Sequence, residues 1–213
     1  MVYFLSGVSQ MEYDWAECLR GLLDPCSRER LDSLKHPAAR RKFLLGRGLL
    51  LYGLRREKGI GRLPPMKITG QGQPVFAEFP LRFSISHSGD AVMAGLHESA
   101  IGVDVEFVRP AYDARAARRV LLREEIEALE KPEDFYACWT ILESYEKARG
   151  TGIRLNEERK AAFPIKKIPH FDYEGYSFAC GNIGDMAYSI CAEGEIPPLC
   201  IVKPEELGAL ILE

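Results

Sequence analysis

The sequence has 213 residues, of which 46% are hydrophobic, and this is enough for one large core or two small ones. Its formal net charge of −3 argues against a polycation that binds nucleic acid through the phosphates. The N-terminal residues lack a basic segment followed by a long apolar run, and no apolar stretch reaches the length of a membrane span, so we expect neither a secretory signal nor a membrane protein.

The first hundred residues predict both helices and strands. In chain order we expect a strand at 2–5, a helix over 12–23 that Asp24-Pro25 ends, a basic segment over 27–42, a long core helix around 43–52, and strands at 66–68, 81–86 and 91–96. A tight turn is predicted at 87–90, and a third strand at 101–106 follows closely, so the last three strands should form an antiparallel meander.

The rest of the chain repeats this order coarsely, with helical patterns first and strands afterwards. We expect helices over 114–130 and from about Pro132 to Gly150, strands at 171–180, 186–192 and 199–202, and a last short helix that begins at Pro204. The six cysteines are scattered without a Cys-x-x-Cys pair, which favours free thiols in a reducing, cytoplasmic compartment over a zinc site.

Two carboxylates share one face of the predicted strand 101–106. Side chains alternate along a strand, so Asp104 and Glu106 should point to the same side. Oxygen ligands of this kind suit Mg²⁺, and Mn²⁺ accepts them as well. On the later helix, Glu143 and Lys147 lie four residues apart on one face, where Glu143 could complete an acidic triad and Lys147 could meet phosphate. The alternatives are an exposed strand face and a solvated surface pair.

Two other places have side chains that suit an anion. The basic segment contains Arg30 and Lys42, which could grip a phosphate or simply form a solvated helix face. His87 lies at a predicted strand end beside serines and a glycine, where side-chain and backbone donors together suit an anion, although a single loop histidine is often a bystander.

The motifs together resemble a known family. They are Gly-Val-Asp-Val-Glu at 102–106, Trp-Thr-Ile-Leu-Glu-Ser-Tyr-Glu-Lys at 139–147 with Gly-Thr-Gly at 150–152, Ile-Ser-His-Ser-Gly at 85–89, and Gly-Gln-Pro at 72–74. In this order and spacing the chain resembles the 4′-phosphopantetheinyl transferase superfamily, of the type that activates surfactin synthetase. The resemblance implies an α+β fold of two similar α/β halves in a pseudo-twofold arrangement, which we place at residues 1–100 and 101–213, the second carrying the metal site.

The resemblance also implies a reaction and its residues. Such enzymes move the 4′-phosphopantetheine arm of coenzyme A to a serine of an acyl or peptidyl carrier protein and release adenosine 3′,5′-bisphosphate, with Mg²⁺ as the metal. Asp104, Glu106 and Glu143 would hold the metal. Glu143 would accept the serine proton directly or through a metal-bound water, and Lys147 would offset the developing charge. Arg30, Lys42, Gln73, Ser86, His87 and Lys147 fall where the family binds coenzyme A. We expect a monomer with neither nucleic-acid nor membrane partners.

Two departures from the family pattern leave alternatives open. Leu142 and Gln73 stand where the family usually has lysines, and each removes a positive charge near the substrate phosphates, unless Leu142 simply joins the apolar face of its helix. A diverged coenzyme A-binding protein without catalysis is therefore the main alternative, and an unrelated Mg²⁺-dependent phosphoesterase is a third. For the carrier, Arg115, Arg118 and Arg119 around the apolar run 120–122 could form a basic rim, or belong to an ordinary amphipathic helix.

Overall fold

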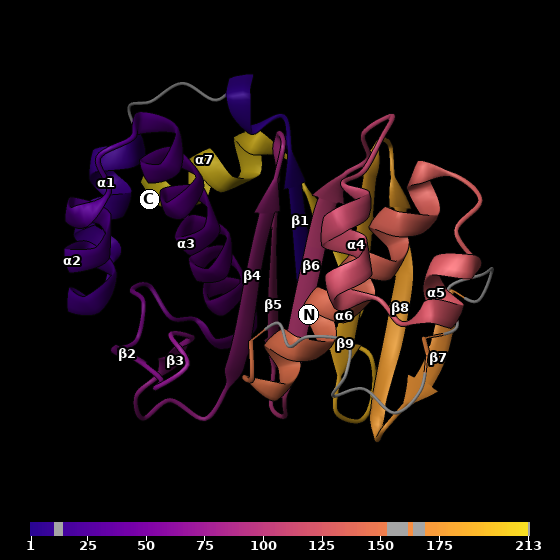
Figure 1. Ribbon diagram of the computed structural model, residues 1–213. Helices are drawn as coiled ribbons and strands as arrows, with labels where there is room; N and C mark the ends of the chain where they lie inside the picture. The colour runs from indigo at the N-terminus through magenta and orange to yellow at the C-terminus, as the bar shows by residue number, and fades with distance from the viewer. Residues whose placement is uncertain (11–14, 153–161, 164–168, 213) are drawn as a thin grey trace. The chain divides into compact units, whose positions relative to one another are not determined.

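Two compact units make up the chain. The computed structural model describes residues 1–10, 15–152, 162–163 and 169–212. The first unit comprises Met1–Glu98 and Pro197–Glu213, and the second comprises Ser99–Ile196. Each unit combines a four-stranded sheet with helices, which confirms the predicted mixed α+β class (Figure 1).

The sheet of the first unit joins both ends of the chain. Its strands are β1 (Val2–Ser6), β4 (Arg82–Ser88), β5 (Ala91–His97) and β10 (Leu199–Val202), in the order β10-β1-β5-β4. β1 is antiparallel to β5 and parallel to β10. Because β10 completes this sheet, the C-terminal segment from Pro197 belongs with the first unit, whereas the sequence placed all of 101–213 in the second half.

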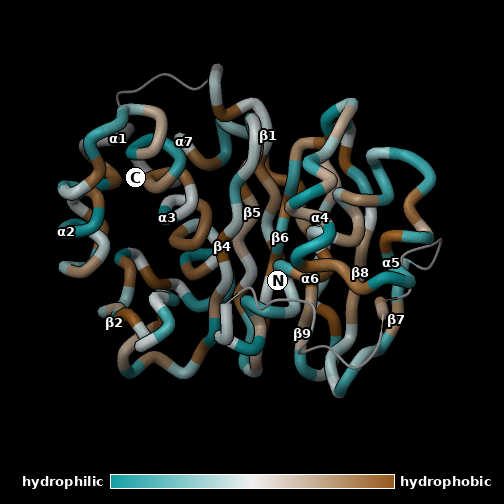
Figure 2. Tube along the Cα trace, viewed as in Figure 1, coloured by the Kyte–Doolittle hydropathy of each residue, from teal (hydrophilic) through white to brown (hydrophobic). Residues whose placement is uncertain are grey.

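Helices cover the first sheet, and the longest of them packs on it. They are α1 (Trp15–Leu22), α2 (Pro25–Ser33), α3 (Pro37–Lys58) and α7 (Pro204–Leu212), with a 3₁₀ turn at Val8–Gln10 and a small hairpin of β2 (Met66–Ile68) and β3 (Pro74–Phe76). The predicted start of the first helix at residue 12 lies outside the described residues. α3 lies against β5, β4 and β1, and Leu45, Leu49 and Leu50 of α3 are fully buried there. In Figure 2 hydrophobic residues recur along α3, as this burial requires.

The second unit has its own sheet and core. The strands β6 (Ile101–Phe107), β7 (His170–Tyr173), β8 (Tyr176–Ile183) and β9 (Met186–Ala192) are ordered β6-β9-β8-β7, and the helices are α4 (Ala114–Val120), α5 (Arg123–Glu127) and α6 (Pro132–Arg149). α6 packs on β6 and β9. It begins at Pro132 and ends at Gly150, which adopts a left-handed conformation with φ 70°, as the sequence predicted.

Several local predictions are corrected by the structure. The three-strand meander is wrong, because β4 and β5 form a hairpin while β6 pairs with β9 in the other sheet. The predicted helix 114–130 is two helices, since the Leu122 N–H donates to Glu125 Oε2 (2.8 Å) and starts α5 anew. The predicted strand 171–180 is the hairpin of β7 and β8, whose turn has Glu174 at φ 47° and Gly175 at φ 83°.

The turn after β4 is also shorter than predicted. His87 and Ser88 still pair with Val92 and Ala91, so β4 continues through both of them and the turn begins at Gly89, with φ 53°. His87 is thus a strand residue with a fixed direction. Among the helices that the structure describes, none is both long and apolar enough to cross a membrane.

Candidate functional site

The acidic site of the second unit is built where α6 crosses β6. Gly102 on β6 lies so close to α6 that a Cβ atom placed on it would come within 1.8 Å of the Ser144 carbonyl oxygen. Only glycine allows this approach without moving the helix backbone. Residues 102, 104 and 106 share one face of the strand, so the contact sets α6 directly over Asp104. A glycine inside a strand pattern often marks such a contact, but the sequence analysis assigned no role to Gly102.

Lys147 and Asp104 form the central contact of this site. The Lys147 ammonium donates to Asp104 Oδ1 at 2.6 Å and to the Val103 carbonyl oxygen at 3.3 Å. The Asp104 side chain is only 4% exposed, so water weakens this ion pair little. Lys147, predicted to offset the charge of the reaction, therefore contacts Asp104, predicted to bind the metal.

Glu143 lies next to this pair in a strongly negative environment. Burial raises the pKa of the Glu143 carboxyl to about 7, and the Asp104, Glu106 and Glu146 carboxylates raise it as well, against the opposing effect of Lys147. The structure thus brings Asp104, Glu106, Glu143 and Lys147 into one electrostatic cluster. Glu146, 2% exposed, is the further acid of this cluster and interacts with Arg149 and the Thr151 hydroxyl.

The three carboxylates predicted to hold a metal are not spaced as the ligands of one ion in this structure. Within the described ranges, no group of three or more His, Cys, Asp and Glu side chains is spaced to hold a metal ion. Instead the Lys147 ammonium is the cation that contacts Asp104. The role of the triad as a metal site remains a prediction.

Two serines line the same face beside Asp104, and the sequence analysis did not identify them. Ser189 on β9 is the register partner of Asp104, and its hydroxyl lies 2.8 Å from that of Ser144 on α6. Both serines are fully buried. Their hydroxyls couple the helix to the sheet one turn before Lys147.

Leu142 has a structural role. It is 1% exposed and belongs to the core of the second unit with Phe135 and Cys138, while Trp139 packs against that core. This confirms the interpretation that Leu142 joins the apolar face of its helix.

The first unit contains a cationic hollow of about 380 Å³. Arg30, Lys42 and His87 line it, together with Leu34, Ala38, Ala39 and Phe43. These three basic residues come from α2, α3 and β4, and all three were predicted to bind the coenzyme. Their convergence on one hollow favours a shared anionic ligand.

The other three residues predicted for this ligand do not line the hollow: Lys147 belongs to the second unit, and Ser86 and Gln73 are in the first. Ser86 is 8% exposed and neighbours His87 on β4, so the two side chains leave opposite faces of the strand. Gln73 does not line the hollow, although Gly72 and Pro74 on either side of it line a second cavity of about 450 Å³. The roles of Ser86 and Gln73 in ligand binding remain predictions.

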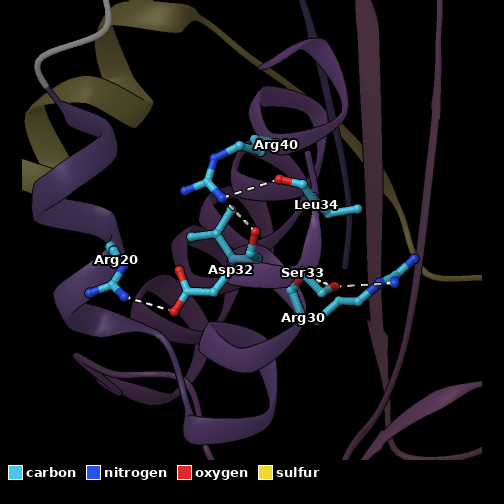
Figure 3. A network of polar contacts seen from close by, with 7 residues as sticks. Arg20, Arg30, Asp32, Ser33, Leu34 and Arg40 are labelled. Carbon is cyan, nitrogen blue, oxygen red and sulfur yellow. Dashed lines mark hydrogen bonds and ion pairs between the residues drawn. The ribbon is translucent and has the colours of Figure 1, made fainter. Parts of the chain in front are cut away.

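A polar network holds α2 in place beside this hollow (Figure 3). Arg40 donates to the carbonyl oxygens of Leu31 (2.7 Å) and Leu34 (3.3 Å). It thereby provides hydrogen-bond donors for carbonyl groups at the C-terminal end of α2. Ser33 donates to the Arg30 carbonyl oxygen (2.7 Å) and accepts from Arg30 Nη1 (3.4 Å). These contacts fix the last turn of α2, which carries Arg30.

The segment considered for carrier binding fits an amphipathic helix. Arg115, Arg118 and Arg119 are exposed on α4, as expected. Val120 and Leu121, however, are 8% and 0% exposed and belong to the core. Of the two alternatives, the exposed apolar patch is therefore ruled out at both positions, and the amphipathic helix agrees with the structure.

Comparison with known proteins matches the segment that carries the acidic cluster. A family model described as the 4′-phosphopantetheinyl transferase superfamily matches residues 100–184. The 4′-phosphopantetheinyl transferase AcpT of Escherichia coli K12 is 34% identical over 161 residues, which cover 71% of this chain and 75% of AcpT. The chain belongs to the 4′-phosphopantetheinyl transferase superfamily.

Other members of the superfamily match over shorter parts. The 4′-phosphopantetheinyl transferase HetI of Nostoc sp. is 33% identical over 147 residues, which cover 62% of each chain. The 4′-phosphopantetheinyl transferase Sfp of Bacillus subtilis is 28% identical over 146 residues, which cover 65% of each chain. The chain thus spans less than two thirds of the length of these two relatives.

Proposed function

We propose that this member of the superfamily transfers the 4′-phosphopantetheine arm of coenzyme A to a serine of an acyl or peptidyl carrier protein and releases adenosine 3′,5′-bisphosphate. We also propose that it is of the surfactin-synthetase-activating type and works in the cytoplasm, where its six free cysteines stay reduced. The observation that carries the proposal is the cluster on α6 and β6: a half-buried Glu143 beside the Lys147–Asp104 pair, inside the segment that matches the superfamily.

Glu143 is the proposed general base. In the transfer, the serine oxygen bonds to the phosphorus that carries pantetheine, the bond from that phosphorus to the bridging oxygen breaks, and the hydroxyl proton goes to Glu143. A base works best when its pKa is near the working pH, and in the metal-free protein burial among carboxylates raises the pKa of Glu143 to about 7. Lys147, beside Glu143 on α6, would offset the charge that develops on the transferring phosphoryl group.

Asp104, Glu106 and Glu143 would hold Mg²⁺, or Mn²⁺ in its place. The residues fit such an ion because they are hard oxygen donors. Burial raises the pKa of Glu143 most, and the Asp104 and Glu106 carboxylates add to this rise, so they contribute negative charge that a divalent cation would relieve. Mg²⁺ usually takes only one or two protein carboxylates besides waters and phosphates, so it does not need a preformed cage of three. When bound, the ion supplies charge neutralisation on the pyrophosphate.

A phosphate of coenzyme A is proposed to bind at Arg30, Lys42 and His87. The support is their convergence on one hollow in the first unit, where charge-assisted hydrogen bonds suit a dianion. Ser86 and Gln73 are also proposed to bind the coenzyme. The support is their position in the chain, since Ser86 adjoins His87 on β4 and Gln73 stands between Gly72 and Pro74, which line the larger cavity.

Intact-mass spectrometry of an apo carrier protein tests the proposal directly. The carrier is incubated with this protein, coenzyme A and Mg²⁺, and a parallel sample contains EDTA. We expect a mass gain equal to one phosphopantetheine that EDTA abolishes.

The other outcomes decide between the remaining functions. Coenzyme A binding without a mass gain across several acyl and peptidyl carriers would favour the non-enzymatic alternative. Hydrolysis of coenzyme A without any carrier would favour a phosphoesterase.

A further inference from the structure

Arg47 is a buried cation on α3 that the proposed reaction does not use. It is 8% exposed, and its Nε donates to the hydroxyl of Ser27, itself 1% exposed, at 3.1 Å. Across the described part of the chain, no carboxylate lies within ion-pair distance of its guanidinium. Burial lowers the pKa of the Arg47 guanidinium to about 10, although the Asp24 carboxylate attracts the charge and opposes this effect. Holding the charge here therefore costs free energy, and stability alone does not account for an arginine at this position.

The guanidinium is stacked against aromatic rings. Its central carbon lies 4.9 Å from the ring centroid of Phe43 and 5.8 Å from that of Phe83. Phe83 is buried in the core, whereas Phe43 is only partly buried and packs against the core from outside. With Nε tied to Ser27, Arg47 is a rigid support for the more exposed ring.

Phe43 is the wall that two hollows share. The hollow of about 380 Å³ contains Lys42 and His87, the cavity of about 450 Å³ contains Arg47 and Ser27, and both are lined by Phe43 and Arg30. A ligand whose phosphate lies at Lys42 and His87 and that also fills the larger cavity meets the two side chains common to both hollows, Arg30 and Phe43. The position of the Phe43 ring therefore affects whether one ligand can occupy both hollows at once.

We propose that Arg47 is a positioning residue for coenzyme A, which holds the Phe43 ring at the boundary of the two hollows so that one ligand occupies both. This inference rests on the proposed function. Arg47 tightens binding of the coenzyme chiefly through Phe43, and it also lines the larger cavity itself. It takes no part in the transfer step, so it affects the KM for coenzyme A and leaves kcat unchanged.

A double-mutant cycle tests this role. In carrier-protein transfer assays, Arg47→Met and Phe43→Ala should each raise the KM for coenzyme A about tenfold, and kcat should stay within about twofold. The double variant should lose clearly less affinity than the two single losses combined, because most of the arginine's effect passes through the ring. Arg47→Lys keeps a cation without the planar fork and should recover part of the loss.

Arg56→Met is the matched control. Arg56 lies on the same helix, stacks on Tyr52 at 5.5 Å and donates to its hydroxyl at 2.7 Å, but it lines neither hollow. Its removal should leave the KM for coenzyme A unchanged. The Arg47→Met variant should still fold, because an apolar side chain replaces a cation buried without an ion pair. The midpoint of its thermal unfolding, compared with that of wild type, checks this.

Three results would overturn the role of Arg47: an unchanged KM, a loss confined to kcat, or additive effects of the two substitutions. Calorimetric titration with coenzyme A in the absence of a carrier gives the same comparison without transfer. Wild-type protein that binds coenzyme A but never modifies a carrier would contradict the proposed function alone. An Arg47→Met variant with unchanged Kd would contradict the positioning role alone.

Discussion

Glu143 combines two properties that individual residues rarely share. It is half-buried, and it lies among three other carboxylates, one of which is already paired with Lys147. Burial and like charges both favour the protonated form, and this is how proteins prepare a carboxyl group for proton transfer near neutral pH. The same arrangement makes Glu143 unfavourable for stability when it is ionised.

Replacement of the carboxyl group by an amide should separate binding from transfer. We expect Glu143→Gln to lower the transfer rate by about 10² or more, because the base is lost, and to change the Kd for coenzyme A by less than about tenfold. Mass spectrometry of the carrier and calorimetry with the coenzyme provide the two measurements. Transfer within a few-fold of wild type would show that Glu143 is neither the base nor a required metal ligand.

Glu143→Gln should also change the pH dependence of stability in metal-free protein. Between pH 4.5, the ordinary value, and about 7, the folded protein keeps the Glu143 proton that the unfolded chain has lost, so wild-type stability falls as pH rises through this window. The Glu143→Gln variant has no carboxyl group at this position, so its stability does not fall for this reason. With EDTA present, urea unfolding should show Glu143→Gln more stable than wild type by about 2 kcal/mol at pH 8, with the gain vanishing near pH 4.5.

An exposed acid on the same helix is the control for this effect. Glu133→Gln removes a surface carboxyl from the first turn of α6 and should give no comparable gain at pH 8. An equal gain for both variants would mean that general charge reduction, and not the buried site, explains the result.

At the scale of elements, the crossing of α6 over β6 determines the geometry of the acidic cluster. Gly102 sets how closely the two elements approach, and Ser144 and Ser189 link them by their hydroxyls. Sequence periodicity predicted both elements and most of their ends, because caps such as Pro132 and Gly150 are local signals. It could not predict their contact, which depends on residues forty positions apart.

Gly102→Ala should disturb this crossing. The added Cβ would meet backbone atoms of Ser144 and Ala148, which cannot rotate away as side chains do, so α6 must shift. We expect a loss of about 2–4 kcal/mol in the free energy of unfolding, typical of overpacking in a tight contact, and a weaker Lys147–Asp104 pair.

Gly21→Ala provides the matched control. No atom lies within 4 Å of the Cβ that this change would add on α1, and alanine is the better helix former. It should leave stability unchanged or raise it by up to about 1 kcal/mol. Equal losses at positions 21 and 102 would mean that the close contact is not the cause.

At the scale of the whole molecule, the chain returns to its first unit at the end. β10 pairs in parallel with β1, and α7 packs beside α1 and α3. Val202 of β10 is 2% exposed and part of the first core, whereas Ile201 next to it is 54% exposed. The C-terminal strand should therefore stabilise the unit that contains the basic hollow.

Paired substitutions on β10 test this arrangement. Val202→Ala should cost roughly 2 kcal/mol of unfolding free energy, while Ile201→Ala should cost less than about 0.5 kcal/mol. Hydrogen exchange should place the weakened amides of the Val202 variant in β1 and β5 and leave β6 and β9 protected. Weakening confined to β6 and β9 would instead support the division that the sequence alone suggested.

The sequence by itself determined the local elements, the mixed α+β class and the candidate residues. Strand alternation placed Asp104 and Glu106 on one face, helical spacing placed Glu143 beside Lys147, and motif order identified the family, because these signals depend on neighbours within a few positions. Only the tertiary structure decided that β6 leaves the predicted meander, that β10 joins β1, and that Lys147 contacts Asp104. It alone showed the buried Arg47 behind Phe43. Strand pairing and packing depend on the burial of residues far apart in the chain, and local periodicity does not encode which distant partner buries a given face.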